Sequence, residues 1–259
     1  MSERRPVVLC FSGHDPCGGA GIQADIEAIH YHAVHCASVL TSLTVQDTHN
    51  VRKILPQAAD ALIEQALVVL ADLTVDVIKI GLLGDAGIVR AVAHILRQYP
   101  LIPVVMDPIL AAGGGTNFAN QALITDIIEY LLPNVTILTP NLNEARRLSG
   151  LTQIELCGIF LLQQGCQYVL LTGADEPTPD VIHQLFYEQY RQVSYTWPRL
   201  SGHYHGSGCT LAASIAAGLA RGMHPVKAIE FAQQYTWQSL QTAYVTGKGQ
   251  CNPNRFLTP

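Results

Sequence analysis

The chain alternates short runs of apolar, often β-branched residues with longer amphipathic stretches, and this alternation most restricts the folds open to it. Parallel strands need a crossover the length of a helix, so the pattern is typical of a parallel sheet with helices on both faces. We expect extended segments at Val7–Phe11, Ser38–Val45, Val75–Ile80, Pro103–Met106, Val135–Leu138 and Tyr168–Leu171. We expect helices at Ile22–His32, Ala58–Ala71, Ala86–Gln98, Thr125–Leu132, Asn143–Ser149 and Gln153–Gly165.

The pattern changes in the last third of the chain. Aromatic and apolar side chains recur through Val181–Trp197, which predicts a small antiparallel hairpin at one edge of the sheet. Two closing helices are expected at Gly208–Ala220 and Pro225–Thr242. No repeat, low-complexity tract or linker interrupts the sequence, so we expect residues 1–259 to form a single α/β domain.

The composition excludes several classes of protein. Apolar residues make up 49% of the 259 residues, which excludes intrinsic disorder. The net charge of −5 argues against a general nucleic-acid binder, and Asp or Gly breaks the longest apolar runs well before the ~20 residues that a membrane span needs. No signal-peptide core and no CxxC pair occur, so we expect seven thiols in the cytoplasm. Only 14% of residues are charged, which favours a covered face, for instance in a homo-oligomer.

The sharpest local feature is the glycine-rich stretch His203–Gly218. Gly206, Ser207 and Gly208 precede a helix of small residues, and free amides at a helix N-terminus can hold an anion. Cys209 lies in the first turn, where the helix end lowers a thiol pKa and suits it to act as base or nucleophile. The alternative is a helix packed tightly on the sheet with an inert thiol, and the spacing alone does not decide between them.

A second glycine-rich stretch, Ser12–Asp25, follows the first expected strand directly. Four glycines in nine residues indicate a loop that passes close to a ligand or to another part of the backbone. Asp25, one turn into the next helix, could hold a polar group of a substrate. The stretch matches neither a P-loop nor GxGxxG, and a tight strand-to-helix turn is the alternative.

Two polar segments follow later strands. Asn141 and Glu144 lie three residues apart, so they share one face of a helical turn and could order a hydrated Mg²⁺ and phosphate oxygens. A helix cap made by the same two side chains is the alternative, and without other evidence it is the better one. Asp107 also ends a strand, where open α/β sheets place groups that contact ligands.

Taken together, these segments resemble the ribokinase-like superfamily, and more closely the bacterial hydroxymethylpyrimidine/phosphomethylpyrimidine kinases of thiamin biosynthesis. The resemblance covers about Val7 to Ala243, and a cysteine in the last glycine loop, where sugar kinases carry Asp, marks the pyrimidine branch. The segments that carry it are Gly13–Asp25, Leu43–Thr48, Lys79–Leu83, Asp107–Ile109, Thr139–Ala145 and His205–Leu211. The resemblance implies a three-layer α/β/α sandwich and a homodimer, with which the low charged content agrees.

The resemblance also implies an activity and roles for individual residues. The γ-phosphoryl group of ATP would pass to the hydroxymethyl group of the pyrimidine, and a second transfer would give the diphosphate. Cys209 would be the base, with the amides of Gly206, Ser207 and Gly208 on the migrating group. The other implied residues are Gln46, Gly13, Asp25, Leu82 and Ile109 for the pyrimidine, Asn141 and Thr172 for ATP, and Glu144 and Asp107 for Mg²⁺.

The sequence departs from that family at two loops. Thr172-Gly-Ala-Asp stands where the family carries a Lys-Gly-Gly-His-like stretch, and Ala111–Gly115 replaces a segment that often carries Lys or Thr before Ser-Gly. We therefore expect weaker ATP binding than in a typical member. Residues 110–120 could form a lid hinged at Gly113–Gly115. A pyridoxal-type kinase and a pyrimidine-binding paralogue with weak or lost catalysis stay open as alternatives.

Overall fold

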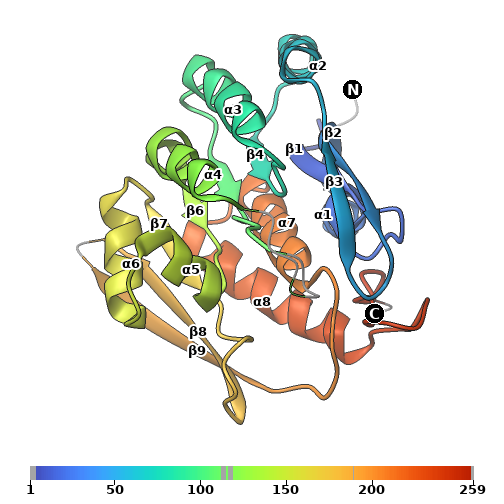
Figure 1. The fold of residues 1–259 in the computed structure, drawn as a ribbon, viewed down its shortest axis with the longest axis vertical. Coiled ribbons are helices and arrows are strands. Elements are labelled where there is room, and N and C mark those ends of the chain that lie inside the picture. The colour runs from blue at the N-terminus through green and yellow to red at the C-terminus, as the bar shows by residue number, and fades with distance from the viewer. Residues whose placement is uncertain (1–3, 112–114, 116–118, 189, 258–259) are drawn as a thin grey trace.

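The computed structural model describes residues 4–111, 115, 119–188 and 190–257, which form a nine-stranded sheet between two layers of helices (Figure 1). The strand order is β3-β2-β1-β4-β5-β6-β7-β8-β9, and the strands from β2 to β7 in this order run parallel. The strands are β1 (Val7–His14), β2 (His35–Gln46), β3 (Val51–Pro56), β4 (Val77–Ile80), β5 (Val104–Met106), β6 (Ile137–Leu138), β7 (Tyr168–Leu171), β8 (Asp180–Tyr187) and β9 (Arg191–Pro198).

Helices cover both faces of the sheet, and each face has its own apolar core. One face carries α2 (Ala59–Asp72), α3 (Ala86–Gln98), α4 (Gln121–Asp126), α5 (Leu142–Ser149) and α6 (Ile154–Gln163). The other carries α1 (Gly21–Tyr31), α7 (Ser207–Ala220) and α8 (Pro225–Gln241). Successive strand residues alternate between the cores, as Leu9 and Cys10 in β1 do, because side chains in a strand point alternately to opposite faces.

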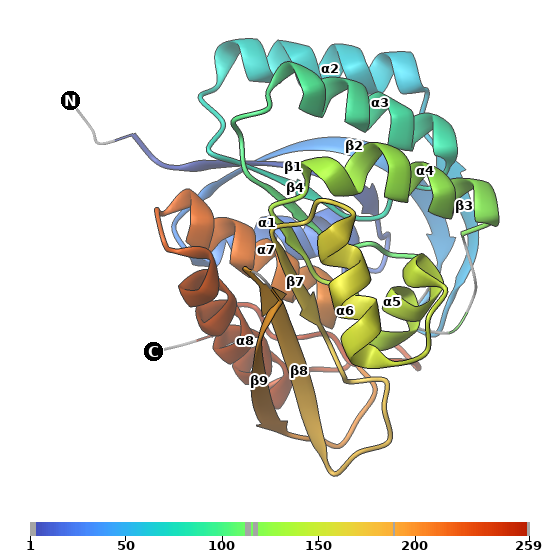
Figure 2. The same cartoon turned by 90° about the vertical axis from the view of Figure 1, so that its left-hand side faces the viewer.

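The expected fold class is confirmed. The six central strands are parallel, helices lie on both faces, and β8 and β9 form the antiparallel hairpin, which lies beside α8 in Figure 2. Within the described ranges, no helix is long and apolar enough to span a membrane.

The expected elements are wrong in two places. An antiparallel strand, β3, closes the other edge of the sheet by pairing with β2, so both edges are antiparallel. The expected helix Thr125–Leu132 instead begins after the cap Asn120, as α4, and passes into a π-helical turn at Ile127–Leu131 and a short 3₁₀ turn at Leu132–Asn134. The proposed lid hinge Gly113–Gly115 lies largely outside the described residues.

Candidate active site

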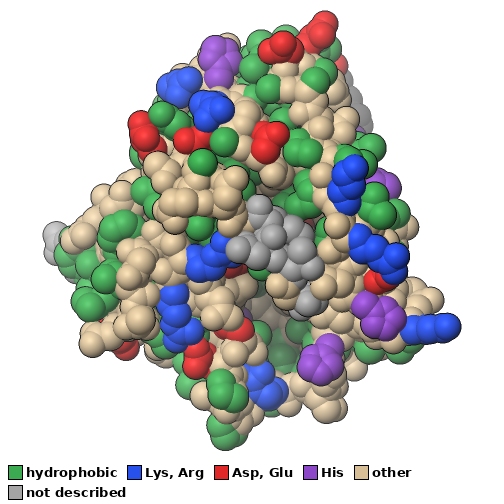
Figure 3. Space-filling view, in the orientation of Figure 1, with side chains coloured by type: hydrophobic (Ala, Val, Ile, Leu, Met, Phe, Trp, Pro, Cys, Tyr) green, Lys and Arg blue, Asp and Glu red, His purple; other side chains and the backbone are tan. Residues whose placement is uncertain are grey.

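A cavity of about 370 Å³ opens where the parallel strands end at their carboxyl termini and α7 begins. Figure 3 shows a recess just below the centre of this face of the molecule. The loop after β1, the end of β2, the residues after β4 to β7 and the first turn of α7 all contribute to its wall. This is where open parallel sheets bind ligands, because loops from several strands converge there.

The first turn of α7 presents free backbone amides to this cavity. Gly206 is the N-cap residue and takes a left-handed conformation with φ of +85°, which suits glycine. A β-carbon at Gly206 would clash with the carbonyl oxygen of Gly19, so the two glycine loops are in direct contact. Among the described residues, no group accepts a hydrogen bond from the amides of Ser207, Gly208 or Cys209. These amides can therefore bind an anion.

Cys209 lies at the floor of the cavity, and only 5% of it is exposed. Burial raises the pKa of its thiol to about 12, although the Lys79 ammonium opposes this rise. The expectation that this pKa is lowered is wrong, because desolvation of the buried sulfur outweighs both the Lys79 charge and the hydrogen bond from the Gly21 amide. The resting group is a neutral thiol.

Behind Cys209, a buried ion pair joins β4 to α1. The Lys79 ammonium lies 2.9 Å from the Asp25 carboxylate, and both side chains are fully buried. Burial lowers the pKa of Lys79, but Asp25 and the other acidic groups around it raise it more, so the lysine stays charged. The pair places a positive charge close behind the thiol.

Two buried carboxyl groups face the cavity from neighbouring strand ends. Burial raises the pKa of Asp107 to about 6, against the opposing effect of Lys79. Burial, and after it the charge of Asp107, raises the pKa of Glu144 to about 8. The Glu144 carboxyl group also accepts hydrogen bonds from the backbone amides of Asn141 (2.9 Å) and Leu110 (3.3 Å). In turn, Oδ1 of Asn141 accepts a hydrogen bond from the Glu144 amide at 2.8 Å and so caps α5.

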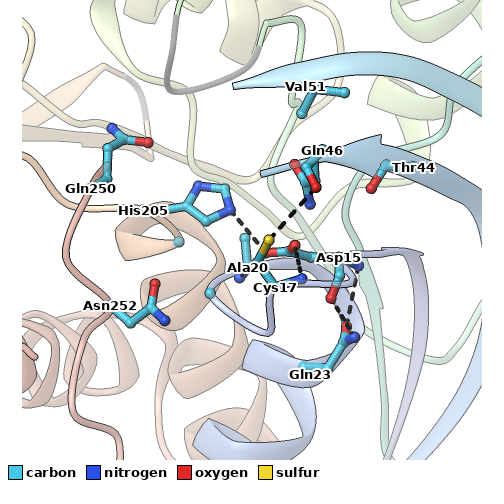
Figure 4. Close-up of polar contacts among 12 residues, drawn as sticks. Asp15, Cys17, Ala20, Gln23, Thr44, Gln46, Val51, His205, Gln250 and Asn252 are labelled. Carbon is cyan, nitrogen blue, oxygen red and sulfur yellow. Dashed lines mark hydrogen bonds and ion pairs between the residues drawn. The ribbon is translucent and has the colours of Figure 1, made fainter. Parts of the chain in front are cut away.

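The loop after β1 contributes a second polar pair, shown in Figure 4. Nε2 of His205 lies 2.9 Å from the Asp15 carboxylate, which also accepts hydrogen bonds from the amides of Cys17 and Ala20. Burial raises the pKa of Asp15, but these hydrogen bonds outweigh it and hold the pKa below its usual value. Gln46 lies across the cavity at the end of β2.

A second cavity, of about 410 Å³, adjoins the first between the β8–β9 hairpin and α8. Trp197 and Trp237 line it, with ring centroids 6.0 Å apart. Ser207, Gly208 and Thr172 line both cavities, so the free amides of α7 lie where the two meet. The arrangement can hold two ligands end to end.

A sequence-family profile described as phosphomethylpyrimidine kinase matches residues 15–254 of the chain. The chain belongs to this family. It is 31% identical to the hydroxymethylpyrimidine/phosphomethylpyrimidine kinase of Bacillus subtilis, over 96% of this chain and 94% of that protein. These matches confirm the kinase family that the sequence motifs predicted.

Two solved structures share the fold. The ADP complex of Bacillus subtilis pyridoxal kinase superposes with a TM-score of 0.90 at 25% identity, covering 97% of this chain and 98% of that one. A phosphomethylpyrimidine kinase from Clostridium difficile gives a TM-score of 0.79 at 25% identity, with 92% and 100% covered. The ribokinase-like fold is confirmed by these neighbours.

The structure of this family member brings nearly all residues expected at the site to the first cavity. Those in its wall are Gly13, Gln46, Leu82, Asp107, Ile109, Asn141, Glu144, Thr172, Gly206, Ser207, Gly208 and Cys209. The exception is Asp25: the expectation that it lines the pocket is wrong, because its carboxylate is fully buried against Lys79. Asn141 and Glu144 form a capping box, which confirms the helix cap, and both also line the cavity, while their role toward Mg²⁺ and phosphate stays a prediction.

Sequence reasoning gave no role to Asp15 and little weight to His205, which pair across 190 positions of the chain. The only signal was that each lies within a glycine-rich stretch. Gln250 also lines both cavities, and nothing in the sequence marks it. Among the described residues, no group of three or more His, Cys, Asp and Glu side chains could hold a metal ion by itself.

Proposed function

We propose that the chain transfers the γ-phosphoryl group of ATP to 4-amino-5-hydroxymethyl-2-methylpyrimidine, and then to its monophosphate to give the diphosphate. The observation that carries this proposal is that two cavities meet at the free amides of Ser207 and Gly208. A phosphoryl group that moves between ligands in the two cavities would pass these amides. Phosphoryl transfer asks mainly for such positioning and charge stabilisation.

The pyrimidine would occupy the first cavity. The Gln46 amide offers both a donor and an acceptor, which suits an aminopyrimidine edge. Leu82 and Ile109 supply apolar contacts for the ring, and Gly13 leaves room because a β-carbon there would lie 2.9 Å from Leu82 Cδ2.

Cys209 would receive the proton of the substrate hydroxyl. Its thiol is hydrogen-bonded to the side chain of Asp107, so the thiol hydrogen can pass to the ionised Asp107 carboxylate as the hydroxyl proton arrives. The alcohol needs its base only late in a loose transition state, so a weak base serves. The amides of Gly206, Ser207 and Gly208 would meanwhile hold the migrating phosphoryl oxygens.

The residues that suit ATP and Mg²⁺ lie beside these amides in the wall of the first cavity, and Thr172 also lines the second cavity. Carboxylate oxygens are the ligands Mg²⁺ prefers, and Asp107 and Glu144 are buried carboxyl groups that a cation would stabilise. Gly208 leaves space beside them, since a β-carbon there would lie 3.3 Å from Asp107 Oδ2. Asn141 and Thr172 would contact the nucleotide, and a bound Mg²⁺ would offset phosphate charge.

A pyridoxal-type kinase is the second candidate. The TM-score of 0.90 to a pyridoxal kinase, against 0.79 to a phosphomethylpyrimidine kinase, favours it on backbone shape. The family match and the Gln46 amide at the ring edge favour the pyrimidine.

An ADP-release assay with hydroxymethylpyrimidine, its monophosphate and pyridoxal tests the proposal. We expect kcat/KM for both pyrimidines to exceed that for pyridoxal by at least about tenfold, the size of one good polar contact. A preference for pyridoxal would favour the second candidate. Calorimetric binding of the pyrimidine without turnover would identify a binding protein that has lost catalysis. Cys209→Ala should abolish turnover and leave pyrimidine binding intact.

We further propose a single catalytic domain, a cytoplasmic homodimer and no nucleic-acid partner. The continuous nine-stranded sheet supports a single domain. The exposed apolar side chains of Leu43, Val45 and Leu55 on β2 and β3 support a dimer. All seven cysteines are free thiols, which suits a reducing compartment, and the net charge is −5. Light scattering tests the dimer, and cell fractionation tests the location.

A further inference from the structure

The segment after α8 returns to the cavity and pairs with the loop ahead of α7. The Cys251 amide donates to the His203 carbonyl and the His205 amide donates to the Cys251 carbonyl, each at 2.9 Å. Arg255 follows Cys251 by four residues, and its carbonyl accepts a hydrogen bond from the Tyr235 hydroxyl at 2.7 Å. The backbone that carries Arg255 is therefore held between the glycine loop and α8.

The Arg255 side chain is fully buried beneath the two glycine loops and makes contacts with three separate segments. Nε donates to Thr210 Oγ1 in α7 at 2.9 Å, and Nη1 donates to Glu27 in α1 at 3.0 Å. Nη2 donates to the carbonyl oxygen of Gly19 in the loop after β1. A planar guanidinium with fixed donor directions can meet three acceptors at once, which a lysine ammonium on a flexible stem does less well.

Two of these acceptors fix the amides that face the cavity. Gly19 O lies directly against Gly206, where it leaves no room for a β-carbon. Thr210 Oγ1 donates to the Gly206 carbonyl at 2.8 Å while it accepts from Arg255. The guanidinium thus holds both sides of the left-handed Gly206 turn, and that turn sets the direction of the amides of Ser207 and Gly208.

We propose that Arg255 is a positioning residue for phosphoryl transfer, which rests on the function proposed above. It touches neither cavity, and Glu27 balances its charge, so its effect reaches the reaction only through the Gly206 turn. Donors that stabilise a transition state must be held in place before the reaction, and a small misplacement lowers the rate more than it weakens substrate binding.

The test compares Arg255→Met and Arg255→Lys with Arg4→Met. Arg4 also forms an arginine–carboxylate pair, with Asp76, but at the opposite ends of β1 and β4 from the cavity. We expect Arg255→Met to lower kcat at least tenfold with the pyrimidine KM within threefold of wild type. The kcat of Arg255→Lys should lie between those of Arg255→Met and wild type, and Arg4→Met should keep the wild-type kcat. Methylguanidine should restore part of the rate of Arg255→Ala.

Hydrogen exchange supplies a readout that does not depend on activity. In Arg255→Lys, the hydrogen-bonded amides of Gly18, Ala20 and Thr210 should exchange faster, while the amides of β4 and β5 keep their rates. A variant that melts at a lower temperature but retains kcat and exchange at Gly18, Ala20 and Thr210 would overturn the proposal. Wild-type protein without turnover, together with faster exchange at these three amides in the variant, would reject the proposed activity and leave the positioning role intact.

Discussion

At the scale of single residues, burial decides the chemistry of the site more than sequence neighbours do. Cys209 follows a glycine loop at a helix N-terminus, an environment that lowers thiol pKa values in exposed sites. Here the sulfur is almost fully buried and faces Asp107 and Asp25 as well as Lys79, so its pKa rises to about 12. In the mechanism proposed above, the thiol therefore carries a proton and does not act as a nucleophile.

The raised pKa predicts how Cys209 reacts with iodoacetamide. Since only the thiolate reacts, its labelling rate should rise about tenfold per pH unit from pH 7 to pH 10 without a plateau. Peptide mass spectrometry measures the rate at this site, with Cys209→Ala as the blank. A labelling rate that reaches a plateau below pH 8 would show that the helix end lowers the pKa of this thiol more than burial raises it.

Glu144 predicts a pH dependence of stability. Its pKa is about 8 in the folded chain and 4.5 as its ordinary value, so the folded state binds more protons between these pH values and loses stability as the pH rises through them. Glu144→Gln removes this loss. The melting temperature of the variant relative to wild type should therefore rise by at least about 2 °C from pH 5 to pH 8.5.

Mg²⁺ provides the matching control for Glu144. A cation held by this carboxylate should raise the wild-type melting temperature more at pH 8.5 than at pH 5 and should have less effect on Glu144→Gln. Parallel curves for the two proteins over the whole pH range would contradict the assigned cause.

At the scale of elements, local patterns predicted the interior strands, the hairpin edge and most helices but missed the edge strand β3. Val51–Pro56 is mostly exposed and carries two adjacent basic residues, so it shows no alternation that would mark a strand. Its pairing with β2 is a tertiary effect. The glycine stretches likewise predicted a cavity, but Arg255 contacts Gly19 across 236 positions, and no local signal predicts such a contact.

Two glycines at the ends of α7 allow a matched prediction. Gly206 and Gly222 have φ of +85° and +82°, but a β-carbon at Gly206 would meet Gly19 and Arg255, whereas one at Gly222 would meet nothing. Gly222→Ala should cost about 1 kcal/mol in the free energy of unfolding, from backbone conformation alone. Gly206→Ala should cost about 2 kcal/mol more and lower kcat; equal losses in urea denaturation would show that the loop contact contributes nothing.

At the scale of the whole molecule, the continuous sheet couples distant parts of the chain. β4 and β1 lie near its centre, whereas the β8–β9 hairpin lies at one edge and packs through Leu185 on the same core as α7 and α8. The buried Lys79–Asp25 pair ties that centre to α1. Loss of any of these contacts should therefore lower the stability of the sheet as a whole.

Urea unfolding tests this coupling, because Trp197 and Trp237 report on the hairpin edge and far-ultraviolet circular dichroism reports on all helices. Lys79→Met leaves Asp25 buried without its partner and should cost about 3–5 kcal/mol. Leu185→Ala at the hairpin should cost about 2–5 kcal/mol. If the sheet unfolds as one unit, each variant shifts the fluorescence and dichroism midpoints equally. A Lys79→Met protein whose tryptophan transition stays in place would instead divide the chain into two independently folding parts.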